Sequence, residues 1–187
     1  MKMKAKVALV IVDTFTSFAA EYAGPSRIAA YLRLNNIPAS LIYVDMDNGI
    51  NDAENLIEQI PEQANIIGFT IYNTNAKIIY SMCNALKKRN KDIFIGVGSQ
   101  MATVASQLIL DECPDIDFVI LGDGELVFYN LILQYENNDY EFDISPHVVT
   151  RKNTTDKYPA VVDIETMPRI SRDFFQTNKN KTSSLRG

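Results

Sequence analysis

Cysteine, histidine and tryptophan are scarce in this chain. Its 187 residues include one histidine, His147, two cysteines, Cys83 and Cys113, and no tryptophan. The two cysteines lack metal-ligand spacing, so a zinc or iron–sulfur site is not expected here, and no Ser-His-Asp or Cys-His set offers a nucleophile. Without an export signal, the two thiols are interpreted as reduced and structural, which predicts a cytoplasmic protein.

Basic residues and long apolar runs are also few. The 18 lysines and arginines are outnumbered by 23 aspartates and glutamates, which gives a formal charge of -5. A nucleic-acid binder would normally present a basic face, so that class is not expected. No apolar run approaches the roughly 20 residues that span a bilayer. The run Val7 to Val12 is short and leads into Asp13, so it predicts a buried strand and not a secretory signal.

Short apolar runs that alternate with helical patterns fill the first two-thirds of the chain. The runs lie at residues 7–12, 39–44, 66–71, 93–97 and 118–121, and helical patterns begin near residues 25, 52, 75, 99 and 125. Repeated strand-then-helix units predict a parallel sheet with right-handed crossovers. The simplest architecture is an α/β, Rossmann-like (flavodoxin-like), doubly wound sheet of five strands in the order 2-1-3-4-5.

The pattern changes after Tyr135. Residues 1–136 are interpreted as the sheet domain, and residues 137–187 as a hairpin and linker extension. Residues 147–150 resemble a strand, and we expect residues 160–162 to be its hairpin partner. The polar stretch at residues 176–184 is interpreted as a linker or docking arm.

Glycines and hydrogen-bonding residues follow the predicted strands. Ligands of open parallel sheets bind at the carboxyl ends of the strands, near the point where strand order reverses, here between the first and third strands. No catalytic residue or metal ligand is predicted in these loops. The candidate cofactor-binding residues are Asp13, Thr14, Phe15, Thr16, Ser17, Thr70, Tyr72, Asn73, Gly96, Gly98, Ser99, Gln100, Gly122, Asp123, Gly124 and Glu125.

These loops have both a ligand-binding and a purely structural interpretation. Glycines let a ligand approach the backbone closely, and free amides at helix N-termini suit a phosphate. The loop at residues 13–18 mixes hydroxyls with two phenylalanines, as suits a large, partly apolar ligand. Glycines after strands are equally common turn residues, Ser99 and Asp123 are plausible helix N-caps, and Glu125 favours a helix start through the dipole. Neither GxGxxG nor GxxxxGK[ST] stands in the right place for a nucleotide site.

Several segments together resemble the cobalamin-binding front domain of radical SAM enzymes. Asp117 to Glu125, DFVILGDGE, resembles the segment D-x-V-x-x-G-E-G-E of that family. Ser184 to Gly187, SLRG, resembles the residues directly before its CxxxCxxC cluster motif. The other resembling pieces, in order, are residues 31–33, 43–45, 67–70, 96–99, 149–151 and 167–173.

The resemblance implies cobalamin with its nucleotide tail inserted into the domain. Thr70 and Tyr72, residues 96–100 and residues 122–125 would line the tail pocket, and residues 13–18 would face the lower side of the corrin. The DxHxxG motif of methionine synthase-like domains is absent, so no protein imidazole is expected to bind cobalt. Ser99-Gln100-Met101 stands where many relatives carry glycine, proline and histidine.

The resemblance also implies a larger enzyme. The [4Fe-4S] cluster and S-adenosylmethionine would belong to a downstream radical SAM domain of the same polypeptide, and cobalamin would act there as a methyl carrier or redox partner. This chain alone is not expected to be an enzyme. Two alternatives remain open: a degenerate domain that serves as scaffold or docking surface without cobalamin, and a flavodoxin-like or response-regulator module. The latter requires an acidic cluster near Asp13 and a lysine after the fifth strand, but the residues directly after Leu121 are Gly-Asp-Gly-Glu, with no lysine.

Overall fold

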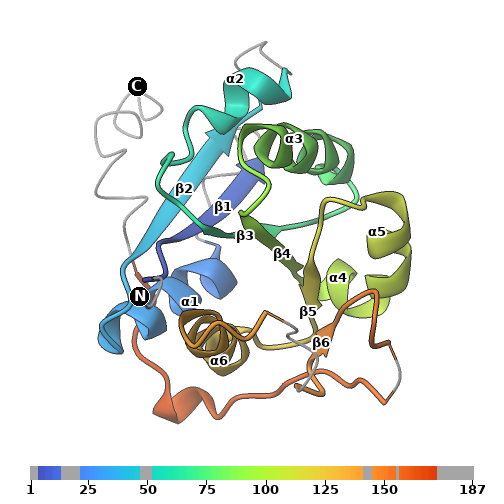
Figure 1. Cartoon of the computed structure of the whole chain (residues 1–187). Helices are drawn as coiled ribbons and strands as arrows, with labels where there is room; N and C mark the ends of the chain where they lie inside the picture. The colour runs from blue at the N-terminus through green and yellow to red at the C-terminus, as the bar shows by residue number, and fades with distance from the viewer. Residues whose placement is uncertain (1–3, 14–21, 47–51, 141–144, 155, 172–187) are drawn as a thin grey trace, which may run out of the picture.

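A twisted sheet with helices on both faces forms the core of the computed structural model, which describes residues 4–13, 22–46, 52–140, 145–154 and 156–171. Its strands follow the order β2-β1-β3-β4-β5-β6 (Figure 1). The first five strands are parallel, and β6 is antiparallel to β5. The strands are β1 (Val7–Asp13), β2 (Ala39–Asp45), β3 (Ile66–Thr70), β4 (Phe94–Gly98), β5 (Phe118–Ile120) and β6 (Val148–Val149).

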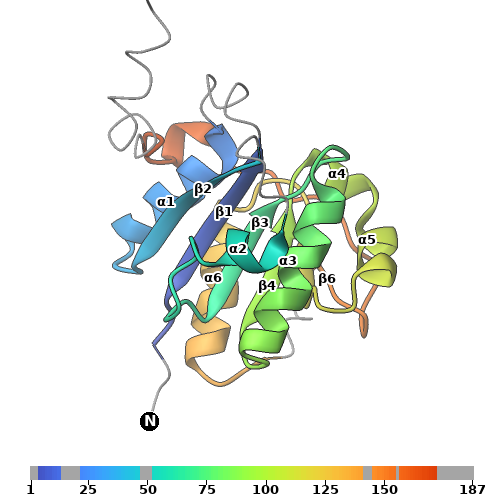
Figure 2. The same cartoon turned by 90° about the horizontal axis from the view of Figure 1, so that it is seen from above.

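The helices divide between the two faces of the sheet (Figures 1 and 2). Helices α1 (Ala23–Leu34) and α6 (Glu125–Glu136) pack on one face together with Leu9 and Phe118. The other face carries α2 (Ala53–Ile57), α3 (Ala76–Arg89), α4 (Gln100–Val104) and α5 (Ser106–Glu112). Because both faces are covered, β1 is an almost continuous run of buried residues. The predicted doubly wound fold and its 2-1-3-4-5 order are confirmed.

The predicted hairpin between residues 147–150 and 160–162 is wrong, because the sixth strand pairs with β5 instead. Val148 and Val149 pair with Ile120 and Val119 of β5, and Ala160 forms a separate bridge with Gly122. A lone two-stranded hairpin is marginally stable in water, whereas the edge of an existing sheet offers unpaired backbone groups and a core to pack against. Val148 and Val149 are buried as a result.

The structure has two helices, α4 and α5, where the sequence predicts one. The pattern from residue 99 to Leu110 predicts a single helix, but the chain breaks at Ala105 between α4 and α5. Both the N–H and the hydroxyl of Thr103 bond to the Ser99 carbonyl. Such back-bonding by threonine side chains bends helices, which accounts for the break.

The residues after α6 pack on the domain. Arg151 donates hydrogen bonds to the carbonyls of Leu110, Cys113 and Ile116 and so completes the end of α5. Ser171 donates its N–H to the Ser26 carbonyl of α1 after the short 3-10 turn η2 (Ile164–Thr166). The predicted linker at residues 176–184 lies outside the described residues.

The two cysteines are buried, free and in contact with each other. A hydrogen bond joins the Cys83 and Cys113 thiols. Burial and this neighbour hold the pKa of Cys83 well above its ordinary value, while the bond from Cys83 lowers the pKa of Cys113. No helix among the described residues is long and apolar enough to cross a bilayer.

Candidate functional site

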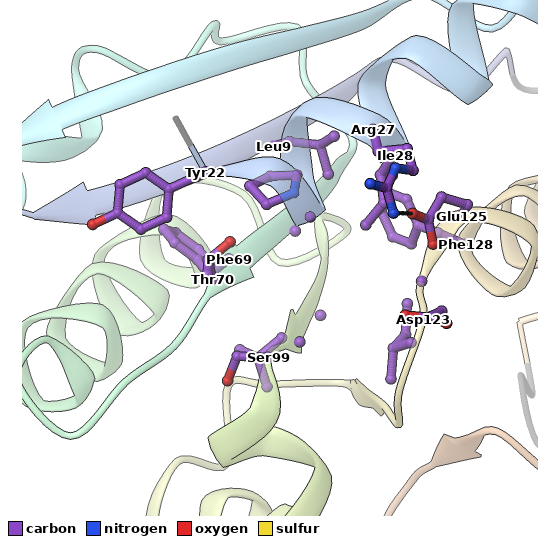
Figure 3. A pocket seen from close by; sticks show the side chains of 18 of the residues that line it. Leu9, Tyr22, Arg27, Ile28, Phe69, Thr70, Ser99, Asp123, Glu125 and Phe128 are labelled. Carbon is purple, nitrogen blue, oxygen red and sulfur yellow. Dashed lines mark ion pairs between the residues drawn. The ribbon is translucent and has the colours of Figure 1, made fainter. Parts of the chain in front are cut away.

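A cavity of about 520 Å³ opens at the carboxyl edge of the sheet, on the face that α1 and α6 cover. Its floor is made by β1, β3, β4 and β5, and its walls are the first turns of α1 and α6 (Figure 3). The cavity therefore lies beside the reversal of strand order between β1 and β3, where parallel sheets bind ligands. Its volume falls within the ordinary range of about 300–1,000 Å³ for small-molecule sites.

Gly68 and Gly96 have no side chain, so the backbone itself forms this part of the cavity floor. Leu9, Gly68, Gly96 and Phe118 are consecutive partners across β1, β3, β4 and β5. A Cβ atom on Gly96 would lie 2.0 Å from the Phe118 ring, and one on Gly68 would lie 3.0 Å from Leu9. A Cβ on Gly98 would meet no atom within 4 Å. Gly68 and Gly96 thus make room for their neighbours, whereas Gly98 leaves open space.

Ser99 shapes the loop after β4. Its hydroxyl donates to the Ile71 carbonyl at 2.5 Å and accepts from the Ala102 N–H at 3.1 Å. The second contact confirms the predicted N-cap of α4. Because both bonds are internal, Ser99 holds the loop beside Gly98 in place.

The loop after β5 is held from two sides. Gly122 has φ +73°, a conformation that favours glycine, and its N–H donates to the Thr103 hydroxyl at 2.9 Å. Asp123 donates its N–H to the Ala160 carbonyl and accepts the Val162 N–H on its carboxylate. The predicted N-cap role of Asp123 is therefore wrong. Gly124 precedes α6 without a side-chain cap, because the carboxylate of Asp123 bonds to the extension instead.

An ion pair joins the two helix walls. Nη1 of Arg27 in α1 and Oε1 of Glu125 in α6 are 3.6 Å apart, and the Glu125 side chain is 4% exposed (Figure 3). Burial raises the pKa of Glu125 and the nearby Asp123 carboxylate adds to this, while Arg27 opposes the rise. Sequence reasoning missed Arg27, since α1 and α6 meet only in the folded chain.

Asn75 fixes the point where strand order reverses. Its amide NH₂ donates to the carbonyls of Val12 at 2.8 Å and Thr70 at 3.2 Å, and its oxygen accepts the Tyr72 N–H at 2.7 Å. The ends of β1 and β3 are thereby tied to the loop that follows β3. Burial, with a smaller effect of Asp13, raises the pKa of the Tyr72 phenol.

Most of the residues chosen from the sequence meet at this cavity. Asp13 accepts a hydrogen bond from the Tyr22 hydroxyl but does not line the cavity, and Asn73 is exposed outside it. Thr14, Phe15, Thr16 and Ser17 lie outside the described residues. The remaining predicted residues all line the cavity: Thr70, Tyr72, Gly96, Gly98, Ser99, Gln100, Gly122, Asp123, Gly124 and Glu125.

The apolar part of the lining was missed. Leu9, Ile28, Ile120 and Phe128 belong to segments that periodicity identifies only as buried strand or helix. The cavity therefore combines an apolar floor with a polar rim. Among the described residues, no three histidine, cysteine, aspartate or glutamate side chains come together as metal ligands. Such a site is suited to holding a large ligand.

Comparison with known proteins identifies the fold family. The model of the B12-binding domain matches residues 21–132. The chain belongs to the B12-binding domain family. Every residue that lines the cavity of this B12-binding domain, except Leu9, falls within the matched range.

Relatives of this B12-binding domain are longer proteins. An uncharacterized methyltransferase of Pyrococcus horikoshii, PH0819, is 33% identical over 67 residues, which are 36% of this chain and 15% of that protein. Two structures of the radical S-adenosylmethionine methyltransferase TsrM from Kitasatospora setae share the fold. The one with cobalamin and a [4Fe-4S] cluster bound gives a TM-score of 0.63 at 14% identity and covers 89% of this chain and 31% of TsrM. The one with tryptophan and a SAM analog bound gives 0.61 at 9% identity and covers 88% and 30%. The chain thus spans under a third of these proteins.

Proposed function

We propose that this chain binds cobalamin, with the nucleotide tail inserted into the cavity between the sheet and helices α1 and α6. The observation that carries the proposal is the cavity itself, about 520 Å³ in a member of the B12-binding domain family. Its floor of glycine backbone and apolar side chains suits a flat aromatic base, and its rim offers hydrogen-bonding groups to a ribose and a phosphate.

The open space above Gly98 is the part of the structure that best fits such a ligand. A side chain there would contact nothing within 4 Å, and Ser99 and Asn75 hold the neighbouring loops through internal hydrogen bonds. Residues 96–100 and 122–125 would contact the tail, while Leu9 and Phe128 would pack against its base.

In this proposal the cobalt ion receives no imidazole from the chain. His147, its only histidine, bonds through Nδ1 to the Tyr158 carbonyl and does not line the cavity. Bound cobalamin would supply a cobalt ion that carries a methyl group or exchanges single electrons. The chain's own residues would bind, orient and shield this cofactor.

We further propose that the module serves a cytoplasmic radical SAM enzyme, whose cluster and S-adenosylmethionine lie in another domain. Similarity of fold to TsrM and the segments that resemble the family support this, and the two free thiols accord with a reducing compartment. The second candidate is a scaffold domain that binds no cofactor. It predicts a cavity filled by bulky side chains, whereas the lining residues leave the cavity open.

Reconstitution with hydroxocobalamin tests the proposal. The native chain is expected to retain the corrin through a desalting column with a shifted visible spectrum, and to retain no FMN under the same conditions. Gly98→Leu should abolish retention by filling the cavity, whereas Val104→Leu, at a position 86% exposed, should not. Loss of all corrin from the folded native chain would refute cobalamin binding.

A further inference from the structure

Arg27 is the only cation among the described residues that line the cavity, which the carboxylates of Asp123 and Glu125 also line. Nη1 of Arg27 and Oε1 of Glu125 form an ion pair at 3.6 Å, a distance longer than that of a normal hydrogen bond. The Asp123 carboxylate already accepts the Val162 N–H. A guanidinium has five N–H donors, so Arg27 keeps most of its capacity for a ligand.

The two partners of the ion pair differ in exposure. The Arg27 side chain is 22% exposed and that of Glu125 is 4% exposed, which places the guanidinium on the open side of the pair. Figure 3 shows the pair beside Ile28 and Phe128, at the boundary between the apolar floor and the polar rim. A charged donor at such a boundary is available to a ligand whose apolar part occupies the floor.

An anionic ligand would need this cation. Two carboxylates line the cavity against one guanidinium, so without Arg27 the lining would repel a negative charge. The nucleotide tail of cobalamin includes a phosphodiester, which carries one negative charge. Arginine binds phosphate oxygens with two parallel N–H donors, a geometry that lysine does not reproduce.

We propose that Arg27 is the residue that binds the phosphodiester of the cofactor's tail, and that Glu125 holds the guanidinium at the cavity wall until the ligand replaces it. This inference rests on the proposed cobalamin function and adds to it the residue that recognises the phosphate of the cofactor's tail. Glu125 competes with the ligand for the guanidinium, so the two partners have opposite effects on binding.

The test compares three ligands on the full chain: hydroxocobalamin, cobinamide, which lacks the nucleotide tail, and cobinamide phosphate. Arg27→Met is expected to weaken hydroxocobalamin and cobinamide phosphate by about 10- to 100-fold and to leave cobinamide unchanged. Arg27→Lys should recover part of the loss. Glu125→Gln, which removes the competing carboxylate, should bind hydroxocobalamin at least as tightly as the native chain. Thermal unfolding establishes that each variant is folded.

Three results would overturn the inference. One is equal affinity of Arg27→Met and the native chain for hydroxocobalamin. Another is an equal loss for cobinamide, which would make Arg27 a residue that supports the fold or the corrin side. The third is an equal weakening by Glu125→Gln, which would make the ion pair purely structural. Failure of the native chain to bind hydroxocobalamin would instead remove the proposed function, and this inference with it.

Discussion

The hydroxyl of Thr103 accepts the N–H of Gly122 at 2.9 Å and thereby joins the loops that follow β4 and β5. The same hydroxyl donates to the Ser99 carbonyl at 2.9 Å. One side chain on α4, outside the cavity lining, therefore sets the distance between two glycine-bearing loops that form the cavity rim. Its position explains how short loops can hold a preformed site.

Replacement of Thr103 by valine should loosen this rim. The isosteric change leaves the Gly122 N–H without its protein partner, and because Gly122 is exposed, water replaces part of the loss. We expect a loss of about 0.5–1.5 kcal/mol in the free energy of unfolding and weaker corrin binding. Thr103→Ser, which keeps the hydroxyl, is the control in denaturant titrations. Equal losses in both variants would contradict the assigned role.

Alanine at Gly96 and at Gly98 should have different effects. At Gly96 the new Cβ would lie 2.0 Å from the Phe118 ring, so we expect a loss of stability of about 1–3 kcal/mol. At Gly98 the new Cβ enters open space, so stability should stay within about 0.5 kcal/mol while binding weakens. Thermal unfolding and corrin titration separate the two effects. A destabilised Gly98→Ala with unchanged binding would contradict this view of the cavity.

Asn75→Ala should be strongly destabilising. The change removes one partner from the Val12 and Thr70 carbonyls and from the Tyr72 N–H, at a position that is 3% exposed. Buried groups left unpaired predict a loss of about 2–4 kcal/mol in urea unfolding. Asn75→Asp keeps the acceptor for Tyr72 but turns an oxygen toward two carbonyls. That variant should therefore lose stability further as pH rises and its carboxyl ionises. A pH-independent loss would speak against this geometry.

Arg151→Met tests whether the extension stabilises the sheet domain. The guanidinium bonds three carbonyls at 2.6–2.9 Å, those of Leu110, Cys113 and Ile116. Its removal should cost about 1–3 kcal/mol, and Arg151→Lys should cost less, because one ammonium can still bond some of these oxygens. Chemical denaturation measures both. A neutral Arg151→Met would mean that the end of α5 needs no such cap.

Glu125 should make stability depend on pH. Its pKa in the folded chain lies above the ordinary 4.5, chiefly because of burial. The folded chain then holds the proton more firmly than the unfolded chain, so the free energy of unfolding falls as pH rises from 4.5 through the raised value. The difference between native and Glu125→Gln chains, measured by denaturant titration across this interval, should show that fall. Arg27→Met should extend the fall to higher pH, since Arg27 holds the pKa down. A flat difference would refute the raised pKa.

Local patterns in the sequence were sufficient for the parallel sheet and most of the cavity rim. Short apolar runs rich in β-branched residues, such as residues 7–12, are typical of buried strands, and the carboxyl ends of parallel strands meet at one edge. Residues of the segments 96–100 and 122–125 line one cavity, as their positions after neighbouring parallel strands predict. Their internal hydrogen bonds were not predicted, because partners such as Thr103 and Val162 lie in other segments.

Competition between distant segments determined the rest, and only the folded chain resolves it. Val148 and Val149 join β5 and not the predicted hairpin partner, because the sheet edge buries them more completely. The pairing of Arg27 with Glu125 depends on how α1 and α6 pack on the same face. Strands and loop ends follow from the periodicity of neighbouring residues, whereas sheet edges and ion pairs depend on the free energy of contacts between residues far apart in the chain.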